Sequence, residues 1–329
     1  MINDIKFILP AVQQGLNIIT TNCNNKENIA LREENFFLAV ANADANAEHT
    51  KNNYIEQFFV GLLEGDGTIT TNKNSSSNTI RVRFLIALKN EINNQIMLNK
   101  IQSIIGGRVV IERQNKYVTW IASSKSDINK VLLVISRYPL LTVRKQCQLE
   151  FAKNCFLYKD QAFAYTTREN FLINRNNMYN NMNELLLEKL NLNIDYFNSR
   201  CDQLGKEKID LPLYFNSWLS GFIEAEGNFS LVFNNKDKLR KSSFTIGQND
   251  DLHILNMIKY YFQSNNKITK DKKNIKYRSK KINSDYYRLS LYNANSRKLL
   301  FEHFNNYPLL GHKKNSYIKF FEYHNQISK

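Results

Sequence analysis

The sequence has no long apolar run and few cysteines, and both deficits exclude classes of protein. No stretch approaches the ~20 consecutive apolar residues that a bilayer span requires, so a membrane protein is not expected. The four cysteines have no CxxC spacing, which indicates reduced thiols and not a disulfide framework or a zinc site. No Cys–His or Ser–His–Asp arrangement is apparent, and the five histidines lack the spacing of metal ligands.

Acidic residues are also in deficit. The 329-residue chain has 45 Lys and Arg against 30 Asp and Glu, a formal net charge of +15. Such a surplus is costly on one compact body unless a polyanion neutralises it. Nucleic acid is the leading candidate, ahead of an anionic membrane surface. The length and the 43% hydrophobic content suit a globular protein of two domains.

A short segment recurs in the chain. Phe59-Val-Gly-Leu-Leu-Glu-Gly-Asp-Gly67 returns as Leu219-Ser-Gly-Phe-Ile-Glu-Ala-Glu-Gly227, and Phe84 returns as Phe244 at the same offset. Tyr138-Pro-Leu-Leu141 returns as Tyr307-Pro-Leu-Leu310 at a longer offset, and the additional residues fall in the basic stretch Lys267–Lys281. Matches in the same order with one insertion indicate two copies of one module.

Each copy predicts the same elements. A helix is expected first, at Asn53–Glu64 and Phe215–Ala225, and alternating patterns predict strands at Thr79–Ala87 and Asn228–Phe233. A helix (Asn93–Ile105; Asp251–Gln263), a second strand pair (Arg108–Ala122; Ile275–Tyr292) and helices around the Tyr-Pro-Leu-Leu element follow. The predicted fold class is α+β, with two pseudo-symmetric αββαββα modules, each an antiparallel, saddle-shaped sheet.

Domain boundaries follow from these patterns. We expect an N-terminal appendage at 1–52, a first domain at 53–159, a polar, Asn-rich linker at 160–212 and a second domain at 213–329.

Small residues lie four apart on each predicted motif helix. Gly61 with Gly65, and Gly221 with Ala225, would let the two helix backbones approach closely, so we expect the helices to pack together. Gly67 and Gly227 follow the helices and are predicted to be left-handed helix stops.

Acids gather at the same two helix ends. Asp66 and Glu226 fall in the last turn, where the helix dipole disfavours an anion by ~0.3–1 kcal/mol, and Glu64 and Glu224 add a second acid to each end. If the helices pair, carboxylates and unpaired carbonyls converge. The expected result is an oxygen-rich site suited to Mg²⁺, or another divalent cation such as Mn²⁺.

The two nonapeptides resemble the LAGLIDADG signature of homing endonucleases and group I intron maturases. The resemblance covers roughly Tyr54–Tyr158 and Leu213–Tyr323. It implies a monomeric, pseudo-twofold enzyme that cuts both strands of double-stranded DNA, with the last acid of each signature, Asp66 and Glu226, holding the catalytic metals. The carbonyls of Gly65 and Ala225 are the candidate backbone ligands.

The resemblance also implies accessory residues. The family places a Lys shortly after its Tyr-Pro-Leu element and often a Gln at a strand end, which fall here on Lys313 and Gln248. In the first copy Arg144 stands at the matching place, with Lys145 beside it, and Leu88 replaces Gln248. Either Arg144 or Lys145 is therefore a candidate, and the asymmetry predicts unequal cutting of the two strands.

Basic residues on the predicted strands are the candidate DNA contacts. Arg81 and Arg83 alternate on one face while Val82 and Phe84 would face the core, and a β-ribbon of this kind fits the major groove. The remaining candidates share a basic side chain on or beside a predicted strand or hairpin: Lys89, Lys236, Lys238, Arg240, Lys241, Lys272, Arg278 and Lys280. About a third of the basic residues would merely solvate hairpins. Strand lengths predict a target of ~20 base pairs.

Two alternatives to a nuclease remain at this point. An RNA-binding maturase for its own intron, or a ribonucleoprotein relative without nuclease activity, would not need the acids. Both acids are present, which favours the nuclease. The composition, rich in Asn, Lys, Ile, Tyr and Phe, is typical of an AT-rich organellar genome and suggests a mitochondrial protein that needs no import signal.

Overall fold

The computed structural model describes residues 50–73, 80–157, 173, 211–234, 239–271 and 286–327. Most of the expected appendage and linker lie outside these residues, as do five of the candidate DNA contacts: Lys236, Lys238, Lys272, Arg278 and Lys280. Those predictions stay predictions. No helix within the described ranges is long and apolar enough to cross a membrane.

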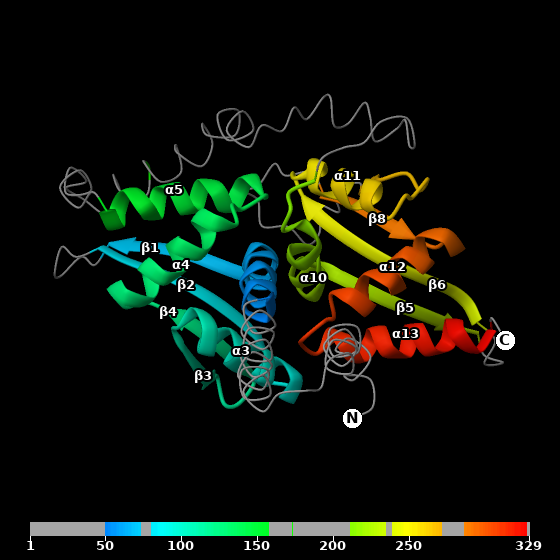
Figure 1. The fold of residues 1–329 in the computed structure, drawn as a ribbon, viewed down its shortest axis with the longest axis horizontal. Coiled ribbons are helices and arrows are strands. Elements are labelled where there is room, and N and C mark those ends of the chain that lie inside the picture. Colours follow the sequence, from blue (N-terminus) through cyan, green and yellow to red (C-terminus); the bar gives the residue numbers. More distant parts are fainter. Residues whose placement is uncertain are drawn as a thin grey trace, which may run out of the picture. The chain divides into compact units, whose positions relative to one another are not determined.

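Both copies contain the same elements in the same order (Figure 1). In the first, a helix over residues 50–65 leads into β1 (Gly67–Lys73), β2 (Ile80–Lys89), α3 (Ile92–Ile105), β3 (Arg108–Glu112), β4 (Tyr117–Ala122), α4 (Lys125–Arg137) and α5 (Val143–Leu157). In the second, α10 (Phe215–Glu226) leads into β5 (Gly227–Phe233), β6 (Leu239–Asn249), α11 (Leu252–Tyr261), β7 (Thr269–Asp271), β8 (Tyr286–Leu291), α12 (Ala294–Asn306) and α13 (Lys313–Ile327).

The sheets confirm the predicted α+β class. Both are antiparallel with four strands, in the orders β1-β2-β4-β3 and β5-β6-β8-β7. Helices α3, α4 and α5 pack against the first sheet, while α11 and α13 pack against the second. The observed order is αββαββαα, since two helices and not one flank each Tyr-Pro-Leu-Leu element.

Strand register confirms the internal repeat. Gly67 pairs with Ile86, and Gly227 pairs with Ile246 in the same way, so the two copies keep one offset over the first strand pair. Phe84 faces Ala122 on β4, and the equivalent Phe244 faces Leu291 on β8, where the longer offset applies. The connection between β3 and β4 is 113–116, whereas that between β7 and β8 is 272–285. The insertion therefore lies in the basic stretch, as predicted.

Burial along β2 follows the predicted alternation. Val82 and Phe84 are buried in the core, whereas Arg81 is exposed and Arg83 half-buried on the opposite, outer face. Because successive side chains point to opposite faces of a strand, one face of the sheet collects apolar groups for the helices to cover. The other face carries the basic residues Arg81, Arg83 and Lys89.

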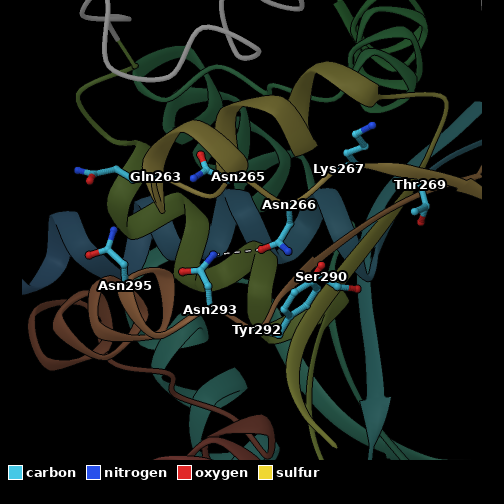
Figure 2. A pocket seen from close by; sticks show the side chains of 9 residues that line it. All are labelled: Gln263, Asn265, Asn266, Lys267, Thr269, Ser290, Tyr292, Asn293 and Asn295. Carbon is cyan, nitrogen blue, oxygen red and sulfur yellow. Dashed lines mark hydrogen bonds between the residues drawn. The ribbon is translucent and has the colours of Figure 1, made fainter.

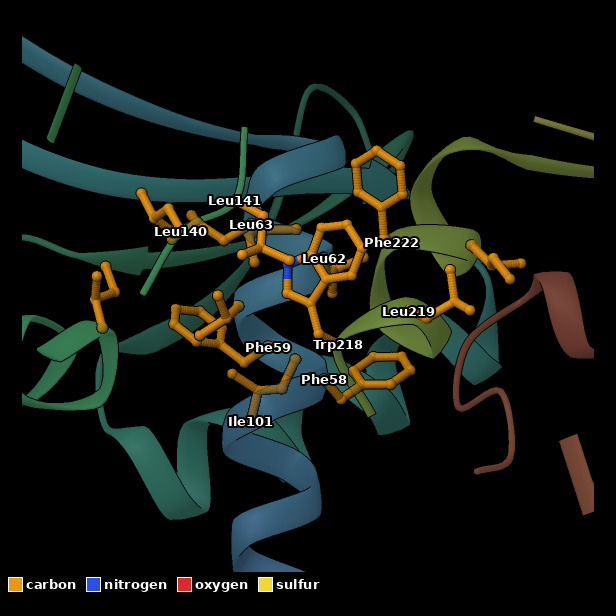
Figure 3. Packing of buried hydrophobic residues seen from close by; sticks show 14 of the residues in the cluster. Phe58, Phe59, Leu62, Leu63, Ile101, Leu140, Leu141, Trp218, Leu219 and Phe222 are labelled. Atoms are coloured by element: carbon orange, nitrogen blue, oxygen red, sulfur yellow. The ribbon is translucent and has the colours of Figure 1, made fainter. Parts of the chain in front are cut away.

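The two motif helices pack backbone to backbone, as their small residues predicted. A β-carbon on Gly61 would overlap the carbonyl oxygen of Trp218 and lie 2.8 Å from the nitrogen of Phe222. Reciprocally, one on Gly221 would overlap the carbonyl oxygen of Phe58. Large apolar side chains from both helices surround this contact (Figure 3). They hold the helix pair as one core.

The expectation of left-handed helix stops at Gly67 and Gly227 is wrong. Gly227 has φ −71° and ψ 151°, extended backbone that any residue adopts, and Gly67 also has no positive φ. Each glycine instead starts a strand that turns back against its own helix. A β-carbon would lie 2.7 Å from the α-carbon of Leu63 in one copy and 2.6 Å from Cγ2 of Ile223 in the other. Glycine is needed here for space.

Candidate active site

Asp66 and Glu226 lie at neighbouring helix ends. The amide of Asp66 still donates to the carbonyl of Leu62, at 3.0 Å, and Glu226 is the last residue of α10. The helices touch at this level, because a β-carbon on Gly65 would overlap that of Ala225. Burial raises the pKa of Glu226, and the negative charge of Asp66 raises it further. The two carboxylates thus share one electrostatic environment.

Two lysines reach the same place. Lys313 Nζ donates to the carbonyl oxygen of Ala225 at 2.8 Å, and Lys145 Nζ donates to that of Gly67. Burial lowers the pKa of both ammonium groups, that of Lys145 to about 8, while Asp66 and Glu226 oppose the change. Each lysine in turn lowers the pKa of both acids against the effect of burial.

The structure places Arg144 and Lys145, the two candidates of the first copy, in different surroundings. Lys145 lies beside the two acids, whereas Arg144 is exposed and its charge lowers the pKa of Asp251 against the effect of burial. Gln248 faces Tyr287 across the β6–β8 pair, half-buried on the face that carries Ile246. Leu88 occupies its place on β2, as predicted, and packs against the core.

Glu64 and Glu224 do not join the other acids. Glu64 Oε1 accepts bonds from the amide of Leu141 and the hydroxyl of Thr142, both at 2.7 Å, while Trp218 Nε1 donates to Oε2. Glu224 accepts from the amides of Gly311 and Lys313 at 3.1 and 2.9 Å. Each carboxylate therefore holds the start of the helix that carries a site lysine.

The donor set fits a hard divalent cation. Among the described residues no cluster of three or more His, Cys, Asp and Glu is present, so the protein would supply two carboxylates, Asp66 and Glu226. Mg²⁺ commonly binds through one or two carboxylates and completes its shell with water and substrate phosphate. The carbonyl of Ala225 already accepts a bond from Lys313. A carbonyl oxygen has two lone pairs, so the carbonyls of Gly65 and Ala225 stay predicted ligands beside the two carboxylates.

Basic side chains line the outer faces of both sheets. Arg81 and Lys241 occupy equivalent register positions in the two copies, and both are exposed. Arg240 is exposed where the β5–β6 register shifts. Lys89 is exposed on the same face of β2 as Arg81 and forms an ion pair of 2.6 Å with Glu91. The faces that the helices leave open are thus positively charged.

A polar hollow of about 580 Å³ lies at the edge of the second sheet (Figure 2). Amides dominate its lining, which consists of Gln263, Asn265, Asn266, Lys267, Thr269, Ser290, Tyr292, Asn293 and Asn295. None of these nine side chains is acidic. Its hydrogen-bonding groups extend the polar outer face beyond β8.

Sequence reasoning missed a pair of tyrosines that join the repeats. Tyr54 Oη donates to the carbonyl of Pro308, and Tyr214 Oη donates to that of Pro139. Tyr54 and Tyr214 occupy equivalent positions of the two copies, and so do Pro139 and Pro308. Each tyrosine therefore reaches the Tyr-Pro-Leu-Leu element of the other copy. The matching offsets were a signal that could have identified them.

A buried histidine gives the fold a pH dependence. His303 Nε2 lies 2.9 Å from Ser220 Oγ, and Nδ1 lies 3.0 Å from Tyr261 Oη. Burial lowers the pKa of His303 to about 3. A group whose pKa is depressed in the folded state contributes stability above its unfolded pKa of ~6.5, and this stability is lost as the pH falls towards the folded value.

We therefore expect the unfolding free energy to fall below pH 6.5 by up to ~1.4 kcal/mol per pH unit from His303. His303→Gln, which keeps a donor and an acceptor, should flatten this slope in denaturant titrations between pH 6.5 and 4.5. His312→Gln is the matched control, since that side chain is exposed. Equal slopes in the wild type and His303→Gln would contradict the assignment.

Comparison with known proteins agrees with this geometry. The family model described as LAGLIDADG endonuclease matches residues 59–155 and 219–324. A probable intron-encoded endonuclease aI3 of Debaryomyces hansenii is 34% identical over 82% of this chain and 38% of its own length. Another from Dictyostelium citrinum is 33% identical over 81% of this chain and 93% of its own.

Among solved structures, the I-LtrWI LAGLIDADG homing endonuclease bound to target DNA has the same fold. Its TM-score is 0.58 at 16% sequence identity, and the match covers 84% of this chain and 91% of that one. The two matched segments lie in the two repeats, and each begins within a motif helix and includes its terminal acid. The chain belongs to the LAGLIDADG endonuclease family.

Proposed function

We propose that this chain is a site-specific DNA endonuclease that makes a divalent-metal-dependent double-strand break and thereby promotes intron homing. The observation that carries the proposal is the meeting of Asp66 and Glu226 at paired helix ends, between Lys145 and Lys313. One chain contains both halves of this site, so a monomer suffices. The intron-encoded relatives and the composition support organellar, mitochondrial expression.

The chemistry follows from the four side chains. Phosphodiester hydrolysis requires a water to be activated, negative charge to be stabilised and a 3′ oxygen to leave. Mg²⁺ or Mn²⁺, when bound, would supply Lewis acidity for the water and the leaving oxygen. Asp66 and Glu226 would hold that cation, while the ammonium groups of Lys145 and Lys313 place positive charge where the phosphate becomes more negative.

The outer faces of the sheets would bind the DNA. Strands β2 and β6 have 10 and 11 residues. At ~3.3 Å per residue two such sheets span ~66 Å, or about 20 base pairs at ~3.4 Å each. Arg81, Arg83 and Lys241 lie on these faces and are suited to phosphate and base-edge contacts in the major groove.

The direct test is cleavage of a randomised DNA pool by the purified protein, with and without Mg²⁺. We expect recovery of one family of cut sites of about 20 base pairs, and only with the cation. Binding of structured RNA with no DNA cut under any condition would favour the splicing alternative instead.

The two lysines should act on different strands. We expect Lys313→Met and Lys145→Met each to slow one strand by roughly 10–100-fold, because each removes one half-buried positive charge beside the acids. Nicked circles should then accumulate from a supercoiled plasmid that carries one site. Arg144→Met is the matched control and should convert circles to linear DNA as the wild type does. Linear product without nicked intermediate in both lysine variants would contradict these roles.

Binding should weaken steeply with salt. Arg81→Gln combined with Lys241→Gln should lower affinity for all sequences and reduce the slope of log K against log salt by ~0.9 for each lost phosphate contact. Filter binding between 50 and 200 mM salt measures this. The control combines Lys125→Gln and Lys298→Gln, exposed positions on α4 and α12. An unchanged slope in the Arg81 and Lys241 variant would exclude these residues from the interface.

A further inference from the structure

Each site lysine follows a loop that the opposite repeat holds. Residues 139–142 lead into α5, which carries Lys145, and residues 308–312 lead into α13, which begins with Lys313. Own-repeat contacts come from Glu64 and Glu224, described above. Further contacts cross the boundary between the repeats and reach main-chain groups at, or just before, the start of these two helices.

The start of α5 and the loop before it are held by the first turn of α11 in the second repeat and by its N-cap residue, Asp251. Asp251 Oδ1 accepts a bond of 3.0 Å from the amide of Val143, the first residue of α5. His253 Nε2 lies 2.9 Å from the carbonyl oxygen of Leu141. Asp251 is 4% exposed and His253 2%. A carboxylate at a helix N-terminus satisfies a free amide and is favoured by the helix dipole. Lys145 lies two residues further on.

The loop before α13 is held by α3 of the first repeat. Asn94 Oδ1 accepts a bond of 2.8 Å from the amide of His312, while its Nδ2 donates to the carbonyl of Lys89 at 3.0 Å. Asn94 is 6% exposed. Gly311 makes room for it, because a β-carbon there would lie 2.8 Å from Asn94 Oδ1. Lys313 is the next residue after His312.

We propose that Asp251 and Asn94 are positioning residues that act across the repeat boundary. Asp251 of the second repeat sets the start of α5 and hence the place of Lys145. Asn94 of the first repeat sets the start of α13 and hence that of Lys313. The inference rests on the proposed function and deepens it: the rate at which each strand is cut depends on both repeats, through an acidic contact in one direction and a neutral amide in the other.

The test is a strand-resolved cleavage assay on a plasmid whose two strands are labelled separately. Asp251→Ala should slow cleavage of one strand by roughly 10-fold, and this should be the strand that Lys145→Met slows. Asn94→Ala should slow, by a similar factor, the strand that Lys313→Met slows. Asp251→Asn keeps an oxygen for the amide of Val143 and should stay within about twofold of the wild type. The controls are the neighbouring Asp250→Asn and, on the exposed face of α3, Asn99→Ala.

Val143→Pro provides a second variant should Asp251→Ala fail to fold. It removes the donor in place of the acceptor, at the first position of a helix, where proline is tolerated. It should slow the strand that depends on Lys145. Suppose that the lysine variants are strand-selective, but the Asp251, Val143 and Asn94 variants slow both strands equally or slow the opposite strand. That result would overturn this inference alone. Lysine variants without strand selectivity would overturn the proposed lysine roles and this inference with them.

Discussion

Asp66→Asn and Glu226→Gln are each expected to abolish DNA cleavage, by a factor on the order of 10³ or more, while DNA binding persists. Each change keeps the shape of the side chain and removes one of two charges that would hold the cation. Among the residues that the structure describes, neither acid has a side-chain hydrogen bond to the sheets with the basic outer faces, so affinity should stay the same or rise as repulsion of phosphate falls.

Plasmid cleavage and gel shift, performed on the same preparations, measure the two effects separately. Glu302→Gln is the matched control, because it removes an exposed acid of α12 that forms an ion pair with Lys298 at 3.8 Å. It should cut at the wild-type rate. A wild-type cleavage rate in either site variant would show that the acid is not a metal ligand, whereas loss of binding would assign it to the DNA interface.

Gly61→Ala and Gly221→Ala are expected to have the largest effect on stability. Alanine is favoured over glycine within a helix by ~1 kcal/mol, yet here each new methyl group would overlap a main-chain carbonyl of the opposite helix. A backbone cannot move aside like a flexible side chain. The helices must separate, at a cost of ~3 kcal/mol or more, the upper range for overpacking. The thermal midpoint should fall by roughly 10 °C.

Gly65 offers a reciprocal control, since its β-carbon would meet that of Ala225 and no backbone atom within 3.5 Å. Gly65→Ala alone should destabilise the helix pair. Adding Ala225→Gly should recover most of the loss, because the methyl group has only moved to the other helix. Ser103 is exposed on α3, so the difference in stability between Ser103→Ala and Ser103→Gly measures the helix propensity of alanine relative to glycine. An unchanged midpoint in Gly61→Ala, or a double variant no more stable than Gly65→Ala, would contradict the packing.

Local pattern predicted the elements and the helix contact because each depends on nearby residues. The small residues of the motif helices are four apart and share a face, and the alternation at Arg81 to Phe84 assigns the two faces of β2. The placement of the acids was only half predicted. Glu64 and Asp66 are two residues apart, about 200° around a helix, so they point in opposite directions. Because they are close in sequence, we expected both acids at one site.

Which of Arg144 and Lys145 lies beside the acids could not be predicted for a different reason. Adjacent residues on a helix differ by about 100°, so the outcome depends on where α5 begins and how it is rotated. Both are determined by bonds from distant residues, Glu64 and Asp251. No spacing near Arg144 carries that information. The prediction of left-handed helix stops was wrong for a related reason. Gly67 and Gly227 are already the first residues of β1 and β5, so no left-handed turn separates each helix from its strand.

The bond between Trp218 and Glu64 has a spectroscopic consequence. The chain contains two tryptophans, and both indoles are fully buried. Trp120 belongs to the first sheet and donates to the carbonyl of Gly106 at 2.8 Å, whereas Trp218 donates to an acid of the opposite repeat. A Trp120→Phe variant would therefore retain one fluorophore, lying between the two motif helices. Its emission maximum would shift to longer wavelength when water reaches the indole of Trp218. The shift would therefore measure directly the separation of the two motif helices.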